Sequence, residues 1–141
     1  MTEETKQQVS LPAVGSSAKR VRAVTDDDIV RFAEVSGDHN PVHLDDAYAA
    51  RSVFGARVAH GFLTGSLISA VIGMDLPGPG SIYLGQTLKF LAPVRIGDIV
   101  TVSVEVIGVR AEKRLVTLRT DATNQDGVLV LTGEATVKYV G

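Results

Sequence analysis

Three side chains suited to acid–base chemistry lie within six positions of one another: Asp38, Asn40 and His43. Pro41 lacks an N–H and disfavours a helical conformation at Asn40, so residues 38–43 are predicted to turn rather than to form one continuous helix. A turn lets Asp38 and His43 converge on one point. A carboxylate and an imidazole about one water apart can take a proton from that water and deliver one elsewhere. Asn40 would then orient the water or the substrate.

A second feature follows at His60-Gly61, where an apolar run begins. If that run is a helix, its first N–H groups have no partner within the helix and carry the positive end of the helix dipole. Gly61 has no side chain, so a ligand oxygen can come close to its N–H. Together with the acid–base residues, this N–H would stabilise an enolate-like oxyanion. For His60 we expect a structural role, with its ring fixing the approach to the helix.

Each residue also has a simpler interpretation. Asp38 could cap a turn, and His43 could be a hydrogen-bonded structural histidine, because clustered titratable groups mark functional sites only statistically. A metal site is the rival chemistry, since His39 and His43 have the i, i+4 spacing of helical ligands, with Asp38 or Asp45 as a third ligand. Pro41 interrupts the helix that this spacing requires, so no metal site is predicted.

Composition limits what such a site is built on. The chain has 141 residues, no cysteine and a net charge of −2, which indicates one domain without disulfides or thiolate chemistry. The absence of a basic run argues against nucleic acid and a membrane surface as partners. The polar residues 1–8 do not resemble a signal peptide, so a soluble cytoplasmic protein is expected. We predict a flexible tail over residues 1–17 and one folded domain over residues 18–141.

Helices are predicted first, after a short strand near residues 19–24. Thr25 is a suitable N-cap for a helix with aspartates at 26–28, and that helix should end at Ser36-Gly37. A second short helix is expected over residues 45–51. The longest helix should cover residues 61–74, which carry no charge and are too few to span a bilayer.

The helix over residues 61–74 is expected to be buried nearly all round. Small residues recur along it at every fourth position, at Gly61, Gly65, Ser69 and Gly73. A stripe of small side chains lets a sheet or a ligand approach the helix backbone closely. The proline- and glycine-rich segment 76–80 should end the helix.

The rest of the chain is predicted to form strands. Valines alternate with polar residues over 100–106, and residues 116–122 repeat the pattern, which is typical of antiparallel strands with one buried face. Residues 124–127 form a hairpin loop, and 128–140 the last strand, with a bulge expected at Gly133. The fold class is therefore α+β, with a long antiparallel sheet wrapped around one central apolar helix.

Several motifs in this order make the chain resemble a known family. They are Asp38-x-Asn40-Pro41-x-His43, His60-Gly61, residues 76–84, and Phe90-x-x-Pro93-Val94-x-x-Gly97-Asp98. The set resembles the MaoC-like (R)-specific enoyl-CoA hydratases of the hot-dog fold, and the similarity extends from about residue 19 to the end. The resemblance implies the reversible addition of water to a trans-2-enoyl-CoA to give the (R)-3-hydroxyacyl-CoA.

The resemblance also implies roles for individual residues. Asp38 and His43 would act on one water, Asn40 would help to position the group, and Gly61 N–H would polarise the thioester carbonyl. Ser69 matches the position of a serine that supports the catalytic pair in this family. No cofactor is implied, because the CoA thioester itself acidifies the α-position. A homodimer is implied, with two sheets joined edge to edge and the acyl-CoA near the interface.

Other functions are also compatible with the sequence. The chain could be a dehydratase acting on acyl carrier protein thioesters, a hot-dog thioesterase, or a non-catalytic acyl-thioester-binding subunit. The complete set of Asp38, Asn40 and His43 argues against a pure binding role, since binding needs no water-activating pair. The sequence does not determine the acyl chain length, because one methylene changes preference by only about 1–3 kcal/mol.

Overall fold

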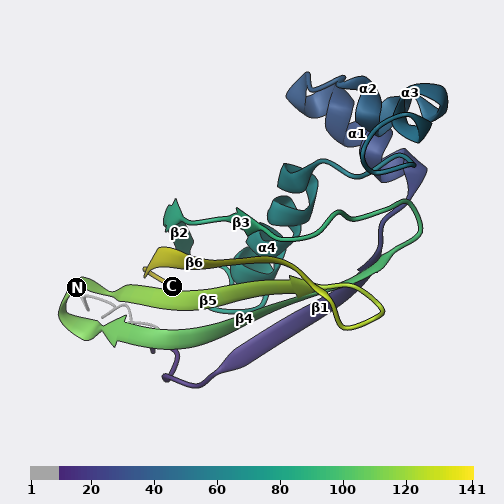
Figure 1. Cartoon of the computed structure of the whole chain (residues 1–141). Coiled ribbons are helices and arrows are strands. Elements are labelled where there is room, and N and C mark those ends of the chain that lie inside the picture. The colour runs from purple at the N-terminus through teal and green to yellow at the C-terminus, as the bar shows by residue number, and fades with distance from the viewer. Residues whose placement is uncertain (1–9) are drawn as a thin grey trace.

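The fold is a curved antiparallel sheet with one long helix against it and three short helices at one end (Figure 1). The computed structural model describes residues 10–141. The strands run in the order β1-β4-β5-β6-β2, and β3 also pairs with β6. The strands are β1 (Ser17–Ala23), β2 (Ser81–Gln86), β3 (Lys89–Phe90), β4 (Ile99–Arg110), β5 (Leu115–Thr123) and β6 (Leu129–Tyr139). The helices are α1 (Asp26–Ser36), α2 (Pro41–Leu44), α3 (Asp46–Ala50), α4 (Gly61–Met74) and the 3₁₀ helix η1 (Ala111–Lys113).

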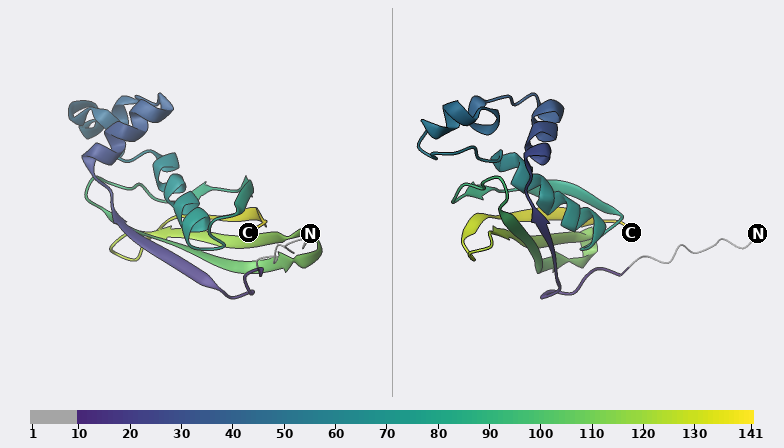
Figure 2. Two further views of the ribbon diagram at one scale, coloured as in Figure 1. Left: turned by 180° about the vertical axis from the view of Figure 1, so that it is seen from behind. Right: turned by 90° about the vertical axis from the view of Figure 1, so that its right-hand side faces the viewer.

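Helix α4 lies obliquely across one face of the sheet, as both views in Figure 2 show. The even-numbered residues of β4 from Val100 to Val106 are fully buried, and the intervening ones are more exposed, so the predicted alternation is confirmed. These side chains and their counterparts on β5 and β6 pack against Ile68, Val71 and Ile72 of α4. The predicted α+β hot-dog architecture, a sheet around a central helix, is confirmed.

The expectation that α4 is buried nearly all round is wrong for the single chain. Phe62 is 66% exposed and Met74 63% exposed, because the sheet covers only one side of the helix. The small-residue stripe does allow close packing at its start. A Cβ on Gly61 would lie 2.7 Å from the ring of Phe90, and one on Gly65 would lie 3.3 Å from Leu88.

The predicted bulge at Gly133 is also wrong. Gly133 pairs in regular register with Thr120, and the β5–β6 register shifts further along, between Ala122 and Thr123. Gly133 is required for another reason: a Cβ there would lie 1.8 Å from the carbonyl oxygen of Thr87. Thr87 lies between β2 and β3, so this glycine lets the chain cross from one short strand to the next along β6.

Local sequence explains the helices that carry the candidate site. The predicted cap of α1 is confirmed: Thr25 and Asp28 form a reciprocal capping box, and the helix ends at Gly37 with φ of 78°. The prediction that 38–43 is not one continuous helix is confirmed as well, but Pro41 begins a single helical turn, as proline favours the first helical position. Helices α1, α2 and α3 gather beyond one end of the sheet (Figure 1).

The described structure begins before the predicted domain boundary at residue 18. Gly15 donates a hydrogen bond to Val106, and Val106 donates one to Ser16, which extends the pairing of β1 with β4. Leu11 also packs against the core. Residues 1–9 of the predicted tail lie outside the described residues.

Candidate active site

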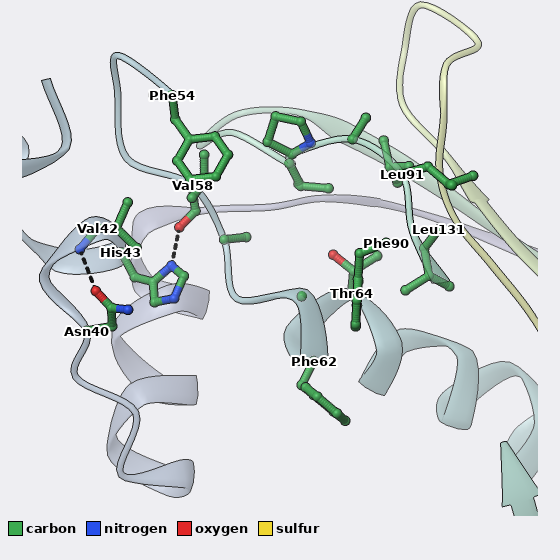
Figure 3. A pocket seen from close by; sticks show the side chains of 16 residues that line it. Asn40, Val42, His43, Phe54, Val58, Phe62, Thr64, Phe90, Leu91 and Leu131 are labelled. Atoms are coloured by element: carbon green, nitrogen blue, oxygen red, sulfur yellow. Dashed lines mark hydrogen bonds between the residues drawn. The ribbon is translucent and has the colours of Figure 1, made fainter. Parts of the chain in front are cut away.

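His43 projects from the single turn of α2 toward the strand-like segment at Val58. Its Nδ1 lies 2.7 Å from the carbonyl oxygen of Val58, a contact drawn as a dashed line in Figure 3. A carbonyl can only accept, so Nδ1 carries the proton and Nε2 keeps a lone pair. The main chain thereby holds His43 in the tautomer that can accept a proton from a water.

Asp38 and Asn40 shape the loop before α2. Asp38 accepts a hydrogen bond from the Asn40 N–H at 3.2 Å through one carboxylate oxygen, which leaves the other oxygen to a ligand. Asn40 is the N-cap of α2, since its Oδ1 accepts from the Val42 N–H at 3.2 Å. The simpler interpretation of Asp38, that it caps a turn, therefore describes one of its two carboxylate oxygens.

The fold brings the predicted acid–base pair together. A carboxylate oxygen of Asp38 and ring nitrogens of His43 and His60 all lie within 4.8 Å of one another. One water can contact groups at such separations, because hydrogen bonds are about 2.7–3.2 Å long. Asp38 is exposed and His43 half-buried, so the pair can meet a substrate from solvent.

Gly61 begins α4 beside this pair. His60, the N-cap, makes no side-chain capping bond, and the backbone N–H groups of Gly61 and Phe62 have no hydrogen-bond partner among residues 10–141. A 14-residue helix directs its dipole at these groups. The predicted oxyanion donor therefore lies at the N-terminus of α4 with its N–H free.

An apolar cavity of about 520 Å³ opens between the loop and α4. Figure 3 shows Asn40 and His43 on one side of it, with Phe62 and Thr64 of α4 and the strand residues Phe90 and Leu131 further along. Gly61 also lines the cavity, whereas Asp38 and Ser69 do not. The other lining residues are almost all apolar: Val42, Phe54, Val58, Ala59, Leu91, Ala92, Pro93, Val94 and Val130.

Ser69 is the predicted site residue that lies apart from the others. It is exposed and two helical turns beyond Gly61, on the side of α4 that the sheet leaves uncovered. In the single chain the side-chain hydroxyl on α4 that lines the cavity belongs to Thr64, which is 2% exposed. Sequence spacing alone did not single out Thr64.

Arg57 is a partly buried cation that the sequence did not single out. Its Nε donates to the carbonyl oxygen of His43 at 2.7 Å, and its terminal nitrogen contacts Asp26 at 2.5 Å. Its side chain is only 10% exposed. Arg57 thus ties α2 to the start of α1, and the only sequence signal was a lone arginine in an otherwise apolar connection.

His39, which with His43 has the spacing of a pair of metal ligands, is not part of the cluster of possible ligands that His43 belongs to among the described residues. His39 is exposed, and its Nδ1 contacts Gly37 O. His60 takes its place beside Asp38 and His43, but the rings of His43 and His60 stack with centroids 3.9 Å apart and planes inclined by 31°. A metal ion lies in the plane of each ligating ring about 2.0–2.1 Å from nitrogen. The planes of the His43 and His60 rings intersect at a point much further from the ring nitrogens than a metal–nitrogen bond is long, so the arrangement does not suit a shared ion.

No helix among residues 10–141 is long and apolar enough to cross a membrane. Lys89 lies on β3 and Arg95 in the loop that follows it, next to the cavity-lining residues Phe90 and Val94. No CoA-phosphate contact is assigned to either residue.

Comparison with known proteins gives consistent matches. The model of the MaoC-like domain matches residues 10–126. A 3-hydroxybutyryl-CoA dehydratase of Methylorubrum extorquens is 51% identical over 89% of this chain and 79% of its own length. An (R)-specific enoyl-CoA hydratase of Rhodospirillum rubrum is 51% identical over 87% of this chain and 85% of its own length.

The fold agrees with a solved structure. The (R)-hydratase from Aeromonas caviae involved in PHA biosynthesis superposes with a TM-score of 0.89 at 45% identity, covering 91% of this chain and 97% of that one. The match of sequence, fold and motif order extends over nearly all of the described residues. The chain therefore belongs to the MaoC-like domain family, as its hydratase motif predicted.

Proposed function

We propose that this protein catalyses the reversible, (R)-specific hydration of trans-2-enoyl-CoA to (R)-3-hydroxyacyl-CoA. The observation that carries the proposal is the placement of His43. Its Nδ1 is occupied by Val58 O, which leaves the lone pair on Nε2 free, and His43 lines an apolar cavity. A ring nitrogen of His43 lies within 4.8 Å of a carboxylate oxygen of Asp38. Relatives about 50% identical over most of the chain carry the names of hydratases and dehydratases of CoA thioesters, which supports the same substrate class here.

The proposed reaction uses the chain's own groups at each step. Asp38 and His43 hold one water, and His43 Nε2 takes a proton from it while the oxygen bonds to C3 of the enoyl group. The π electrons of the C2–C3 double bond shift into the C1–C2 bond, and those of the thioester carbonyl move to its oxygen, where Gly61 N–H stabilises the negative charge. Asp38 and His43 then deliver the proton to C2. Water has thus been added across the double bond, and both side chains regain their starting protonation.

The apolar lining explains where the acyl chain goes. Residues such as Phe90 and Leu131 line the cavity beyond the polar groups, so an alkyl tail is removed from water there. Burial of apolar area contributes about 25 cal/mol per Å². Asn40 at the polar edge keeps its amide nitrogen available to the water or to the substrate.

The proposal predicts that purified protein removes the enoyl-thioester absorbance of crotonyl-CoA without releasing free thiol. Chiral analysis of the product should give (R)-3-hydroxybutyryl-CoA, and the reverse reaction should regenerate the absorbance. Release of CoA thiol would instead identify a thioesterase. Absence of turnover on CoA thioesters of short and medium chain length, together with turnover of the matching acyl carrier protein thioesters, would assign the dehydratase function.

We further propose that the reaction needs no cofactor or metal. The stacked rings of His43 and His60 do not suit a shared ion, and the thioester already acidifies the α-position. Activity of the purified protein should be unchanged after dialysis against EDTA, with metal content measured by mass spectrometry on the same sample. Loss of activity in EDTA and its return with Zn²⁺ would contradict this.

A homodimer joined along β2 is also proposed. The outer β1 edge carries Lys19, Arg20 and Arg22, the kind of charges that protect an open edge, whereas Ile82 and Leu84 on β2 are exposed apolar residues. The apolar side of α4 that the sheet leaves uncovered is a second surface that a partner would bury. The cytoplasmic location expected from the sequence stays a prediction.

Light scattering should therefore give a mass twice that of one chain. Ile82→Lys should shift the protein toward the monomer, because a cation would be buried at the joined edge. Val21→Lys, at an exposed apolar position on β1 (63% exposed, against 47% for Ile82), is the matched control and should stay dimeric. A monomeric wild-type protein, or a dimer that only Val21→Lys disrupts, would contradict the assignment.

A further inference from the structure

His60 is a buried histidine that the proposed reaction does not use directly. It is 2% exposed, precedes α4 and does not line the cavity. The expected role, fixing the approach to the helix, is not supported by a capping bond, because its side chain makes none. Its contacts are with the loop that carries the acid–base pair.

Two of these contacts reach both members of the pair. His60 Nε2 donates a hydrogen bond to the main-chain carbonyl oxygen of Asp38 at 3.0 Å. The ring of His60 stacks on that of His43 with centroids 3.9 Å apart. The ring of Phe32 also packs against the ring of His60, with centroids 4.9 Å apart. One side chain therefore fixes the backbone at Asp38 and the ring of His43 at once.

The remaining nitrogen of His60 argues against a purely stabilising role. Nδ1 is buried and has no hydrogen-bond partner among the described residues. A buried acceptor without a partner is unfavourable, and an apolar side chain of similar size would fill the same space without that cost. A histidine at this position is explained by what its other nitrogen and its ring do for Asp38 and His43.

We propose that His60 is a positioning residue for the hydration, holding Asp38 and His43 at the separation at which both contact one water. This inference rests on the proposed hydratase function. His60 acts on geometry. Its hydrogen bond to the carbonyl oxygen of Asp38 fixes the position of the loop backbone, and its stacked ring fixes the rotation of the His43 imidazole about the bond to Cβ. Rate depends steeply on such placement, because reacting groups must lie within about 3–3.5 Å in the right orientation.

Two substitutions separate the two contacts. His60→Gln keeps an amide N–H near the place of Nε2 but removes the ring, whereas His60→Phe keeps a flat ring but removes the donor. His60→Ala removes both. In His60→Ala we expect kcat for crotonyl-CoA to fall by about 10- to 100-fold with KM nearly unchanged, since a misplacement of about 1 Å has that effect. His60→Gln and His60→Phe should each lose less than His60→Ala.

Matched controls separate positioning from folding. His39→Gln changes an exposed histidine of the same loop and should keep full activity. Ile72→Val weakens the buried side of α4 away from the cavity, so it should lower the denaturation midpoint without changing kcat. Unfolding midpoints are measured for all variants, and if His60→Ala does not fold, the Gln and Phe variants carry the test.

A spectroscopic readout is independent of turnover. Long-range ¹H–¹⁵N correlations report which ring nitrogen carries the proton, and in the wild-type protein His43 should be protonated on Nδ1. We expect this tautomer to be lost or averaged in folded His60→Gln, which lacks the ring, and to be kept in His60→Phe, which retains it. If wild-type protein hydrates crotonyl-CoA and His60→Gln keeps both kcat and the His43 tautomer, the positioning role is wrong. If His60→Gln disturbs the tautomer but wild-type protein has no hydratase activity, the proposed function fails and the contact with His43 stands.

Discussion

Replacing either member of the acid–base pair is expected to lower kcat for crotonyl-CoA hydration by about 10²–10⁴-fold, the range of general acid–base catalysis. Asp38→Asn keeps an oxygen that can accept from the Asn40 N–H, so the turn should survive while the charge is lost. His43→Asn keeps an amide N–H near the place of Nδ1, which can still donate to Val58 O, but it has no equivalent of Nε2. Both variants should therefore fold and still fail to activate water.

The measurement is the initial rate of absorbance loss, with kcat and KM separated. His39→Asn is the matched control, since it makes the same change at an exposed histidine in the same loop. It should keep wild-type kinetics. Full activity in folded Asp38→Asn and His43→Asn would mean that the loop is structural and that the reaction takes place elsewhere on the protein.

The second large effect is expected at the start of α4, where one backbone N–H can be deleted. Gly61 is the first residue of the helix, a position that accepts proline, and His60 has φ of −58° and ψ of 136°, which suits a residue before proline. Gly61→Pro therefore removes the proposed oxyanion donor within a compatible backbone. Loss of one such donor typically lowers kcat by about 10²–10³-fold.

Gly61→Ala is the matched control for this substitution. Both variants place a Cβ against the Phe90 ring, which would lie 2.7 Å away and must move, but only proline deletes the N–H. The ratio of kcat between Gly61→Ala and Gly61→Pro isolates the contribution of the donor. Equal kcat values in the two folded variants would show that Gly61 N–H does not contact the developing oxyanion, and the free N–H of Phe62 would be tested next.

Much of the fold was predictable because it depends on local patterns. The alternation of valines along β4, the Thr25 cap of α1 and the break that Pro41 makes in any helix over residues 38–43 each act over a few residues. The expectations that were wrong concern packing between distant segments. The bulge expected at Gly133 is a case in point, because that glycine makes room for the carbonyl of Thr87, far away in the sequence.

The candidate site divides in the same way. Local sequence was enough to predict that Asp38, Asn40 and His43 lie on one turn and that a free N–H follows at Gly61, because proline chemistry and helix termini act over a few residues.

Which atoms meet in the site depends on contacts between segments that are distant in the sequence. Val58 selects the His43 tautomer, His60 joins Asp38 to His43, Arg57 holds α2, and Thr64 rather than Ser69 lines the cavity. These contacts span 14 to 22 residues, or depend on which side of α4 the sheet covers. A hydrogen bond to a carbonyl or a stack of two rings leaves no periodic trace in the sequence, since it depends on the path of the chain between the partners.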